Sequence, residues 1–438
     1  VAIEAAPEIP PSAVHSKAAP MEAAPSIIAS APVKPQPAYS CKARIESLSK
    51  TELRGWAVNT LDQAECFSID ILIDDMFFCH ARNEHRRSDL LRAGLSDGIG
   101  GIQVALPLAE LGSGTYNIGL RTPDGKVLSR EITIEAEQRH NRWTSYVAPI
   151  LPRDTAIIIP VYNAYDDVVN CIDRLAAFTT DDVEILFIDD ASPDDRIATL
   201  MEQAKTHPNM RVLRNDANIG FTRTVNRGLA EIGKKHAVLL NSDARVTHGW
   251  LEGMLTAASS RPRVATVTAM SDRAGAFSAP NIGNDNELPP GVDEVTYARA
   301  FRRRALGLYP IVPTGNGFCM FGNRACIDEI GSLDEVAFPR GYGEENDFCM
   351  RAGRAGWSNV IDDRTYVFHD RSKSFGGAKT DLMKSGRSVI DARYPEYKTA
   401  IRVFSSGTDI GLARIHARMA QRDCTVPREK PAAPPKPT

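Results

Sequence analysis

The fold is decided by residues 156–192, which read AIIIPVYNAYDDVVNCIDRLAAFTTDDVEILFIDDAS. Predicted strands at 156–161 and 184–188, apolar apart from Glu184, flank a segment in which apolar residues recur at intervals of three and four, the spacing of one helix face. Apolar strands separated by a helix are typical of a parallel sheet with helices on both faces. The stretch therefore predicts an α/β fold built on a Rossmann-like, mostly parallel sheet.

The same alternation continues downstream, and three of the predicted strands are followed by polar residues, at 162–163, 189–192 and 241–243. The carboxyl ends of parallel strands lie at one edge of a sheet, and ligands bind outside that edge. Taken alone, the acids at 189 and 190 are also typical of residues that cap a following helix. Three strand ends of this kind together favour a binding site.

The segments on either side of this region have other patterns. Residues 41–137 alternate apolar and polar side chains with a period of two between turn signals, which predicts a small antiparallel β-sandwich. Both ends of the chain are rich in Ala and Pro, a composition that favours disorder. We therefore predict a disordered arm at 1–40, the sandwich at 41–137, a linker at 138–153, the α/β domain at 154–404, a helix at 405–424 and a disordered tail at 425–438.

Composition excludes several classes of function. The 438 residues include 52 Lys and Arg against 55 Asp and Glu, a net charge of −3, so no basic excess favours a nucleic acid partner. No apolar run approaches the roughly 20 residues that cross a bilayer. The 8 cysteines form no CxxC pair, which argues against a zinc ribbon or a disulfide scaffold and favours a reducing, cytoplasmic location.

Six short motifs occur in a fixed order along the α/β domain. They are IPVYN at 159–163, IDDAS at 188–192, NIGF at 218–221 with NRG at 226–228, LNSD at 240–243, GYGEEND at 341–347, and His369. In this order they resemble the family-two glycosyltransferases, inverting enzymes of GT-A fold that use nucleotide-diphosphate sugars. The resemblance covers about residues 154–394. The preceding sandwich is similar to the immunoglobulin-like modules appended to bacterial glycosyltransferases.

The resemblance implies a donor site at the strand ends. The residues it assigns to the nucleotide sugar are Pro160, Tyr162, Asn163, Asp190, Asn218, Arg223, Asn241, Ser242 and Asp243. A carboxylate at 190 suits the imide N–H of uracil or thymine, because it can only accept a hydrogen bond. A UDP or dTDP sugar is therefore the expected donor.

The resemblance also implies a divalent cation. The triplet at 241–243 stands in place of the family's Asp-x-Asp signature, with Asn241 where the first acid is expected. Asp243 and His369 are the implied ligands of Mg²⁺ or Mn²⁺, which would neutralise charge on the donor's phosphates. Arg371 and Lys373 either close over the diphosphate or form a solvated basic loop.

An inverting transfer requires a base near the acceptor hydroxyl. The motif at 344–347 places Glu345 in the position of the family's base, and it puts Glu344 and Asp347 on the acceptor side. Asp347 has an alternative, since Arg351 follows it at the i, i+4 spacing of a helical ion pair. The remaining acceptor or sugar candidates are Gly315, Asn316 and Gly317, which could equally form a simple turn.

The expected function is transfer of a hexose or deoxyhexose from a nucleotide-diphosphate sugar to a glycan or lipid-linked acceptor in cell-envelope polysaccharide biosynthesis. The alternative is a non-catalytic carbohydrate-binding or scaffold protein with a degenerate transferase domain, an interpretation that Asn241 and Glu345 keep open. The helix at 405–424 carries apolar residues beside arginines. It either packs on the α/β domain or rests on the inner face of an anionic membrane as a peripheral contact.

Overall fold

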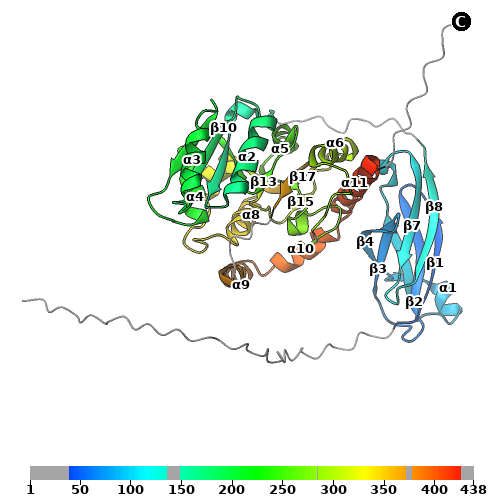
Figure 1. Cartoon of the computed structure of the whole chain (residues 1–438). Coiled ribbons are helices and arrows are strands. Elements are labelled where there is room, and N and C mark those ends of the chain that lie inside the picture. Colours follow the sequence, from blue (N-terminus) through cyan, green and yellow to red (C-terminus); the bar gives the residue numbers. More distant parts are fainter. Residues whose placement is uncertain (1–38, 136–147, 284, 371–376, 426–438) are drawn as a thin grey trace, which may run out of the picture.

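The computed structural model describes residues 39–135, 148–283, 285–370 and 377–425 (Figure 1). They form an N-terminal β-sandwich and a larger α/β part, joined side by side. The predicted arm, the tail, most of the linker, and Arg371 and Lys373 lie outside the described residues.

The sandwich consists of two four-stranded antiparallel sheets, with strand orders β1-β2-β6-β5 and β4-β3-β7-β8. Inward side chains such as Ile69, Ile71 and Ile73 are fully buried in one core between the sheets, which confirms the period-two prediction. An immunoglobulin-like relationship stays a prediction. The elements are β1 Cys41–Leu48, β2 Glu52–Asn59, β3 Ser68–Ile73, β4 Met76–Arg82, β5 His85–Arg86, α1 Ser88–Arg92, β6 Ile99–Ala105, β7 Gly114–Arg121 and β8 Val127–Ile134.

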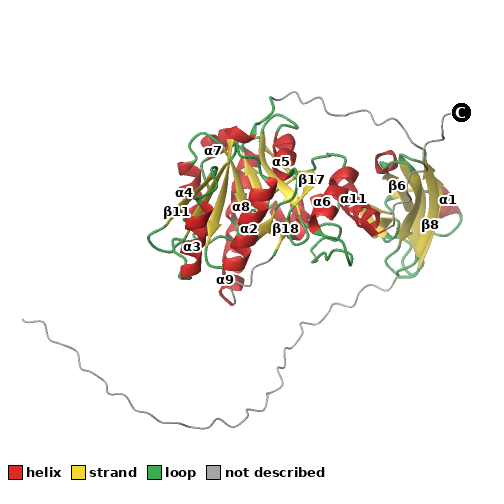
Figure 2. Ribbon diagram, turned by 45° about the horizontal axis from the view of Figure 1, so that its top comes forward, coloured by secondary structure: helices red, strands yellow, loops and turns green. Residues whose placement is uncertain are grey.

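The α/β part is built on an eight-stranded sheet of order β11-β10-β9-β12-β16-β14-β17-β15 (Figure 2). The pairs among β9, β10, β11 and β12 are parallel, whereas β16 is antiparallel to both of its neighbours. The mostly parallel sheet is therefore confirmed. Its strands are β9 Thr155–Val161, β10 Glu184–Asp189, β11 Met210–Arg214, β12 His236–Leu240, β14 Val264–Met270, β15 Ile311–Val312, β16 Cys319–Gly322 and β17 Ser358–Tyr366.

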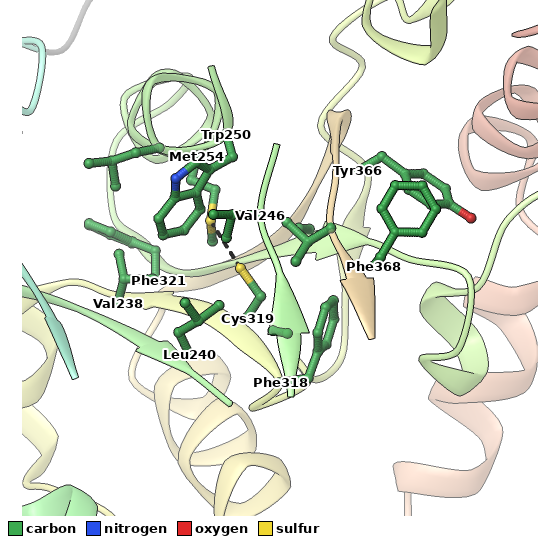
Figure 3. Close-up of a cluster of buried hydrophobic side chains, with 14 of the residues drawn as sticks. Val238, Leu240, Val246, Trp250, Met254, Phe318, Cys319, Phe321, Tyr366 and Phe368 are labelled. Carbon is green, nitrogen blue, oxygen red and sulfur yellow. Dashed lines mark hydrogen bonds between the residues drawn. The ribbon is translucent and has the colours of Figure 1, made fainter. Parts of the chain in front are cut away.

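Helices cover both faces of this sheet because alternate residues of its strands point to opposite sides. Ile157 and Ile159 of β9 pack with α2, α3 and α5, whereas Ile158 packs with α4, α7 and α8. In the first core, Cys319 lies beneath Trp250 with its sulfur 3.6 Å from that of Met254 (Figure 3). The helices are α2 Tyr165–Phe178, α3 Asp195–Ala204, α4 Phe221–Glu231, α5 Trp250–Ala258, α6 Glu294–Arg304, α7 Arg324–Ile330, α8 Glu344–Arg354, α9 Gly377–Arg393, α10 Tyr397–Ser405 and α11 Thr408–Thr425.

Helix α11 joins the two parts of the molecule. Ile410 and Ala413 are buried in the core of the α/β part, and Leu412 and Ile415 are buried in the core of the sandwich. Arg422 also pairs with Asp74 of the sandwich at 3.2 Å. The packed alternative for this helix is therefore confirmed, and its apolar side chains are covered within the molecule.

None of the helices in the described part of the chain has the length and hydropathy of a membrane span. All eight cysteines lie in that part and none is in a disulfide.

Candidate active site

The first strand end turns sharply at the edge of the sheet. Asn163 and Ala164 both adopt left-handed backbone conformations, with φ of 58° and 56°, directly before α2. The Asn163 N–H donates to Ser192 Oγ at 2.9 Å, which ties this turn to the end of β10. Pro160 is half-buried in β9, and Tyr162 is 37% exposed at the edge. The structure therefore brings the first two strand ends together and leaves an aromatic ring exposed beside them.

Asp190 holds the loop that follows β11. Its Oδ1 accepts hydrogen bonds from Asn215 Nδ2 at 2.7 Å and from the Ile219 N–H at 2.9 Å, and its Oδ2 accepts from the Gly220 N–H at 2.9 Å. A carboxylate has about four acceptor positions, so about one is left for a nucleotide base. Asp190 therefore supports the loop, and its contact with a nucleotide base stays a prediction. The sequence could not show this, because Asn215 lies 25 residues away.

Two other donor-site predictions have weaker support. Asn218 lies exposed on the loop that Asp190 holds, and Arg223 is exposed on α4 with its Nε 3.9 Å from Glu335 Oε1. The described contacts link neither side chain to the strand ends.

Asp243 and His369 meet where two short strands pair. β13 (Ala244–Arg245) and β18 (Phe368–His369) are antiparallel, and they bring His369 Nε2 to 3.2 Å from Asp243 Oδ1. Asn241 Nδ2 lies 3.4 Å from the same ring nitrogen. Ser242 is half-buried in this turn. The structure therefore gathers the predicted triplet and the predicted histidine at one point.

The contact of the other ring nitrogen of His369 indicates which tautomer the neutral ring adopts. Nδ1 lies 3.2 Å from the Arg273 carbonyl oxygen, which can only accept a hydrogen bond, so Nδ1 carries the proton in the neutral ring. Nε2 is then an acceptor that faces a carboxylate oxygen. Two acceptors at this distance repel each other unless a proton or a cation lies between them. The donor set of one imidazole nitrogen and one carboxylate oxygen therefore fits a divalent cation.

The surrounding charge supports the same interpretation. Asp167 on α2 faces this point, and its pKa is raised by burial and then by the nearby negative charges of Asp243 and Asp370. In the described part of the chain, no group of three or more His, Cys, Asp or Glu side chains is arranged to hold a metal. A cation held by Asp243 and His369 would therefore need further oxygen ligands from outside these residues, such as phosphate oxygens.

A clamp that the sequence analysis missed holds the two short strands in place. Asp370 forms ion pairs with Arg245 and with Arg273, the latter at 3.1 Å. Asp272 Oδ1 accepts the His369 backbone N–H at 2.9 Å. The only signal in the sequence was that Asp370 directly follows His369, because its cationic partners lie more than ninety residues away.

The segment at 314–318 connects the cation site to α8. The Phe318 ring stacks on His369 with centroids 5.0 Å apart, and the Phe318 carbonyl accepts the Asn241 N–H at 2.8 Å. At the other end, the Gly315 N–H donates to Cys349 Sγ of α8 at 3.1 Å. A Cβ on Gly315 would lie 2.6 Å from the Met320 sulfur, so this glycine is required by packing within the protein.

The other two residues of this segment have different surroundings. The Asn316 N–H donates to Thr268 Oγ1 at 3.1 Å, and its Oδ1 accepts the Phe318 N–H, so Asn316 shapes the turn. A Cβ on Gly317 would meet no atom within 4 Å. A role toward the acceptor stays a prediction for Asn316 and Gly317.

The first turn of α8 carries two buried carboxyl groups. Glu344 is 5% exposed and Glu345 is half-buried. Burial raises the pKa of both, and the neighbouring Glu345 raises that of Glu344 further, well above its ordinary value. A carboxyl group whose pKa is raised is a stronger base when ionised, which suits it to accept a proton from a substrate.

Asp347 has a structural role. Its Oδ2 pairs with Arg351 Nε at 2.8 Å, and its Oδ1 accepts from Arg393 and from the Tyr394 hydroxyl, each at 2.8 Å. Burial and this hydrogen bond raise the pKa of Tyr394 to about 12, so the hydroxyl keeps its proton. Partners within the protein therefore contact both of its oxygens, and the acceptor-side role of Asp347 stays a prediction. The alternative pairing with Arg351 is confirmed.

The contacts of Asp347 should contribute to the stability of the fold. Asp347→Asn should lower the free energy of unfolding by about 2–3 kcal/mol, since hydrogen bonds to charged groups are lost inside the protein. Urea denaturation would measure the loss. Asp328→Asn is the control, because its pair with the exposed Lys234 is a surface ion pair worth at most about 1 kcal/mol. Unchanged stability together with lost sugar transfer would instead place Asp347 in the chemistry.

Comparison with known proteins finds glycosyltransferases. Residues 156–331 match the family described as Glycosyl transferase family 2. The N-acetylglucosaminyl-diphospho-decaprenol L-rhamnosyltransferase of Mycobacterium tuberculosis is 27% identical over 224 residues, which cover 46% of this chain and 71% of that protein. An uncharacterized glycosyltransferase of Escherichia coli, YibD, is 32% identical over 103 residues, 24% of this chain and 30% of that protein.

Among solved structures, GalNAc-T7 with UDP, GalNAc and Mn²⁺ has a TM-score of 0.44 at 17% identity. The match covers 56% of this chain and 48% of that one, so this chain spans about half its length. The match of residues 156–331 to this family and the glycosyltransferases among the relatives support a glycosyltransferase.

Proposed function

We propose that this protein transfers a sugar, with inversion, from a UDP or dTDP sugar to a glycan or lipid-linked acceptor. The observation that carries the proposal is the 3.2 Å approach of Asp243 Oδ1 to His369 Nε2, with Nδ1 of the same ring against the Arg273 carbonyl. The relative from Mycobacterium tuberculosis is named for a diphospho-decaprenol acceptor, which supports the lipid-linked alternative.

In the proposed site, Asp243 and His369 would hold Mg²⁺ or Mn²⁺. When bound, such an ion supplies positive charge to the diphosphate that leaves. On the protein's side, Tyr162 is exposed where a base would lie, and the acceptor position left on Asp190 suits the imide N–H of uracil or thymine.

Glu345 would act on the other substrate. The acceptor oxygen forms a bond to the anomeric carbon while the bond from that carbon to the phosphate oxygen breaks, and the bonding pair leaves with the nucleoside diphosphate. Glu345 takes the hydroxyl proton. The segment at 314–318 contacts both His369 and Cys349, and it would lie between the donor and acceptor sides.

A thermal-shift panel tests the donor proposal. The Tm is measured with UDP-glucose, with dTDP-rhamnose and with GDP-mannose, each in the presence of Mn²⁺ and again in EDTA. A ligand at about 100 times its Kd adds about 2.7 kcal/mol, which raises the Tm by several degrees. A shift with a pyrimidine donor only when Mn²⁺ is present supports the proposal. A shift with GDP-mannose alone would contradict the base specificity, and no shift with any nucleotide sugar would favour the carbohydrate-binding alternative.

A further inference from the structure

Glu344 and Glu345 have buried carboxyl oxygens that meet no hydrogen-bond donor. Oε2 of each residue is buried and without a hydrogen-bond partner in the described part of the chain. Both residues lie in the first turn of α8, directly after Gly343, whose φ is 135°. A Cβ at 343 would lie 2.6 Å from the Phe338 ring, so packing on both sides fixes where this turn begins.

The arginine side chains near this turn pair with another acid. Arg351 and Arg393 both pair with Asp347, and no ion pair within the described residues includes Glu344 or Glu345. The titratable groups that influence the two glutamates from packed elements are Tyr342, Cys349 and Tyr397, all neutral near pH 7. The Asn346 amide, which could have donated, instead contacts the Tyr397 hydroxyl at 2.6 Å.

Simultaneous ionisation of Glu344 and Glu345 is strongly disfavoured in this buried turn. Each would be buried without a cation, and each would repel the other at close range. One proton shared by the pair removes the repulsion and leaves one buried charge in place of two. The more buried Glu344 is the residue that keeps it, because burial and then the charge of Glu345 raise its pKa well above the ordinary value, whereas the pKa of Glu345 is raised by burial.

We propose that Glu344 is a positioning residue for the transfer: as a neutral acid it donates a hydrogen bond to Glu345 and keeps that carboxylate ionised. The inference rests on the proposed function of Glu345 as base. It separates two adjacent acids into two roles, one that holds a proton and one that accepts the acceptor's proton. When Glu345 has taken that proton, both members of the pair are neutral, and the buried site then has no unpaired charge.

Two substitutions of similar size at Glu344 test whether its hydrogen-bond donor matters or only its volume. Glu344→Gln keeps an N–H donor and cannot ionise, so it should hydrolyse dTDP-rhamnose or UDP-glucose, with water as acceptor, within about threefold of the wild-type rate. Glu344→Met fills the same space without a donor. The acidic limb of its kcat/KM profile should shift to higher pH by about one unit, because the ionised form of Glu345 loses a hydrogen bond.

A second measurement does not depend on activity. In protein labelled with ¹³C at glutamate side chains, one carboxyl carbon should report a protonated group at pH 7 in the wild type and be absent from Glu344→Gln. If no glutamate is protonated at pH 7, or if the Gln and Met variants have the same pH profile, the inference is wrong. Glu345→Gln distinguishes the two proposals: full hydrolysis by that variant would refute the base assignment, whatever the NMR shows of Glu344.

Discussion

Asp243→Ala is expected to abolish Mn²⁺ binding and to slow sugar transfer by about a thousandfold. Asp243 supplies one of the two protein groups that would hold the cation, and the charge stabilisation a bound cation gives is worth several kcal/mol, with about 1.4 kcal/mol for each tenfold in rate. The fold should survive, because the pairing of β13 with β18 uses backbone groups. Calorimetric titration with Mn²⁺ measures the binding loss without reference to activity.

Asp166→Ala is the matched control for this variant. Asp166 is an exposed acid in the first turn of α2, beside Asp167, and removing it lowers the local negative charge without removing a ligand. It should bind Mn²⁺ nearly as well as the wild type. Undiminished transfer by Asp243→Ala, or by wild-type protein in EDTA, would remove the cation from the mechanism.

The strands and their ends could be predicted because the information is local. In β9, successive isoleucines are buried on opposite faces of the sheet, so an unbroken apolar run already implies a strand with helices on both sides. The turns after β9, β10 and β12 follow directly from where these runs stop. The same reasoning placed Asp243 and Asp190 at one edge.

The roles of individual acids could not be predicted, because their partners lie far away in the sequence. Asp347 and Asp370 are similar acidic residues beside predicted motifs, yet one fixes α9 to α8 through Arg393 and the other clamps β13 to β18 through Arg245. Asp190, predicted to bind the base, also accepts three hydrogen bonds from the loop at 215–220, and no local pattern indicates these. Spacing shows which residues share an edge of the sheet, and it does not show which of them are already paired.

The antiparallel strand β16 was missed for a different reason. It has only four residues, Cys319–Gly322, and follows a glycine-containing segment that predicts a turn. Its position is set by pairing with β12 and β14 on either side, which is a tertiary effect. This strand matters for the site, because it fixes Phe318 against His369.

Glu345→Gln is expected to keep donor and Mn²⁺ binding while losing transfer by about 10²- to 10⁴-fold, the usual contribution of a general base. The amide preserves the shape of the side chain but cannot take up the acceptor's proton. Because burial raises the pKa of Glu345, wild-type activity should fall on the acidic side at a higher pH than for an exposed glutamate. The rate rises with pH, since only the ionised form is a base. Initial rates of donor hydrolysis across pH measure the loss of rate in Glu345→Gln and the pH dependence of the wild type.

The neighbouring acids serve as controls for this last variant. Glu344→Gln should cost little, since a donor remains at that position, and Asp347→Asn should cost stability more than rate because its oxygens are already paired. If Glu345→Gln keeps the wild-type rate while Glu344→Gln is inactive, the base lies one residue earlier on α8 and the reaction class is unchanged. If all three variants transfer at the wild-type rate, the acidic turn only begins a helix, and the proton must leave by a group outside α8.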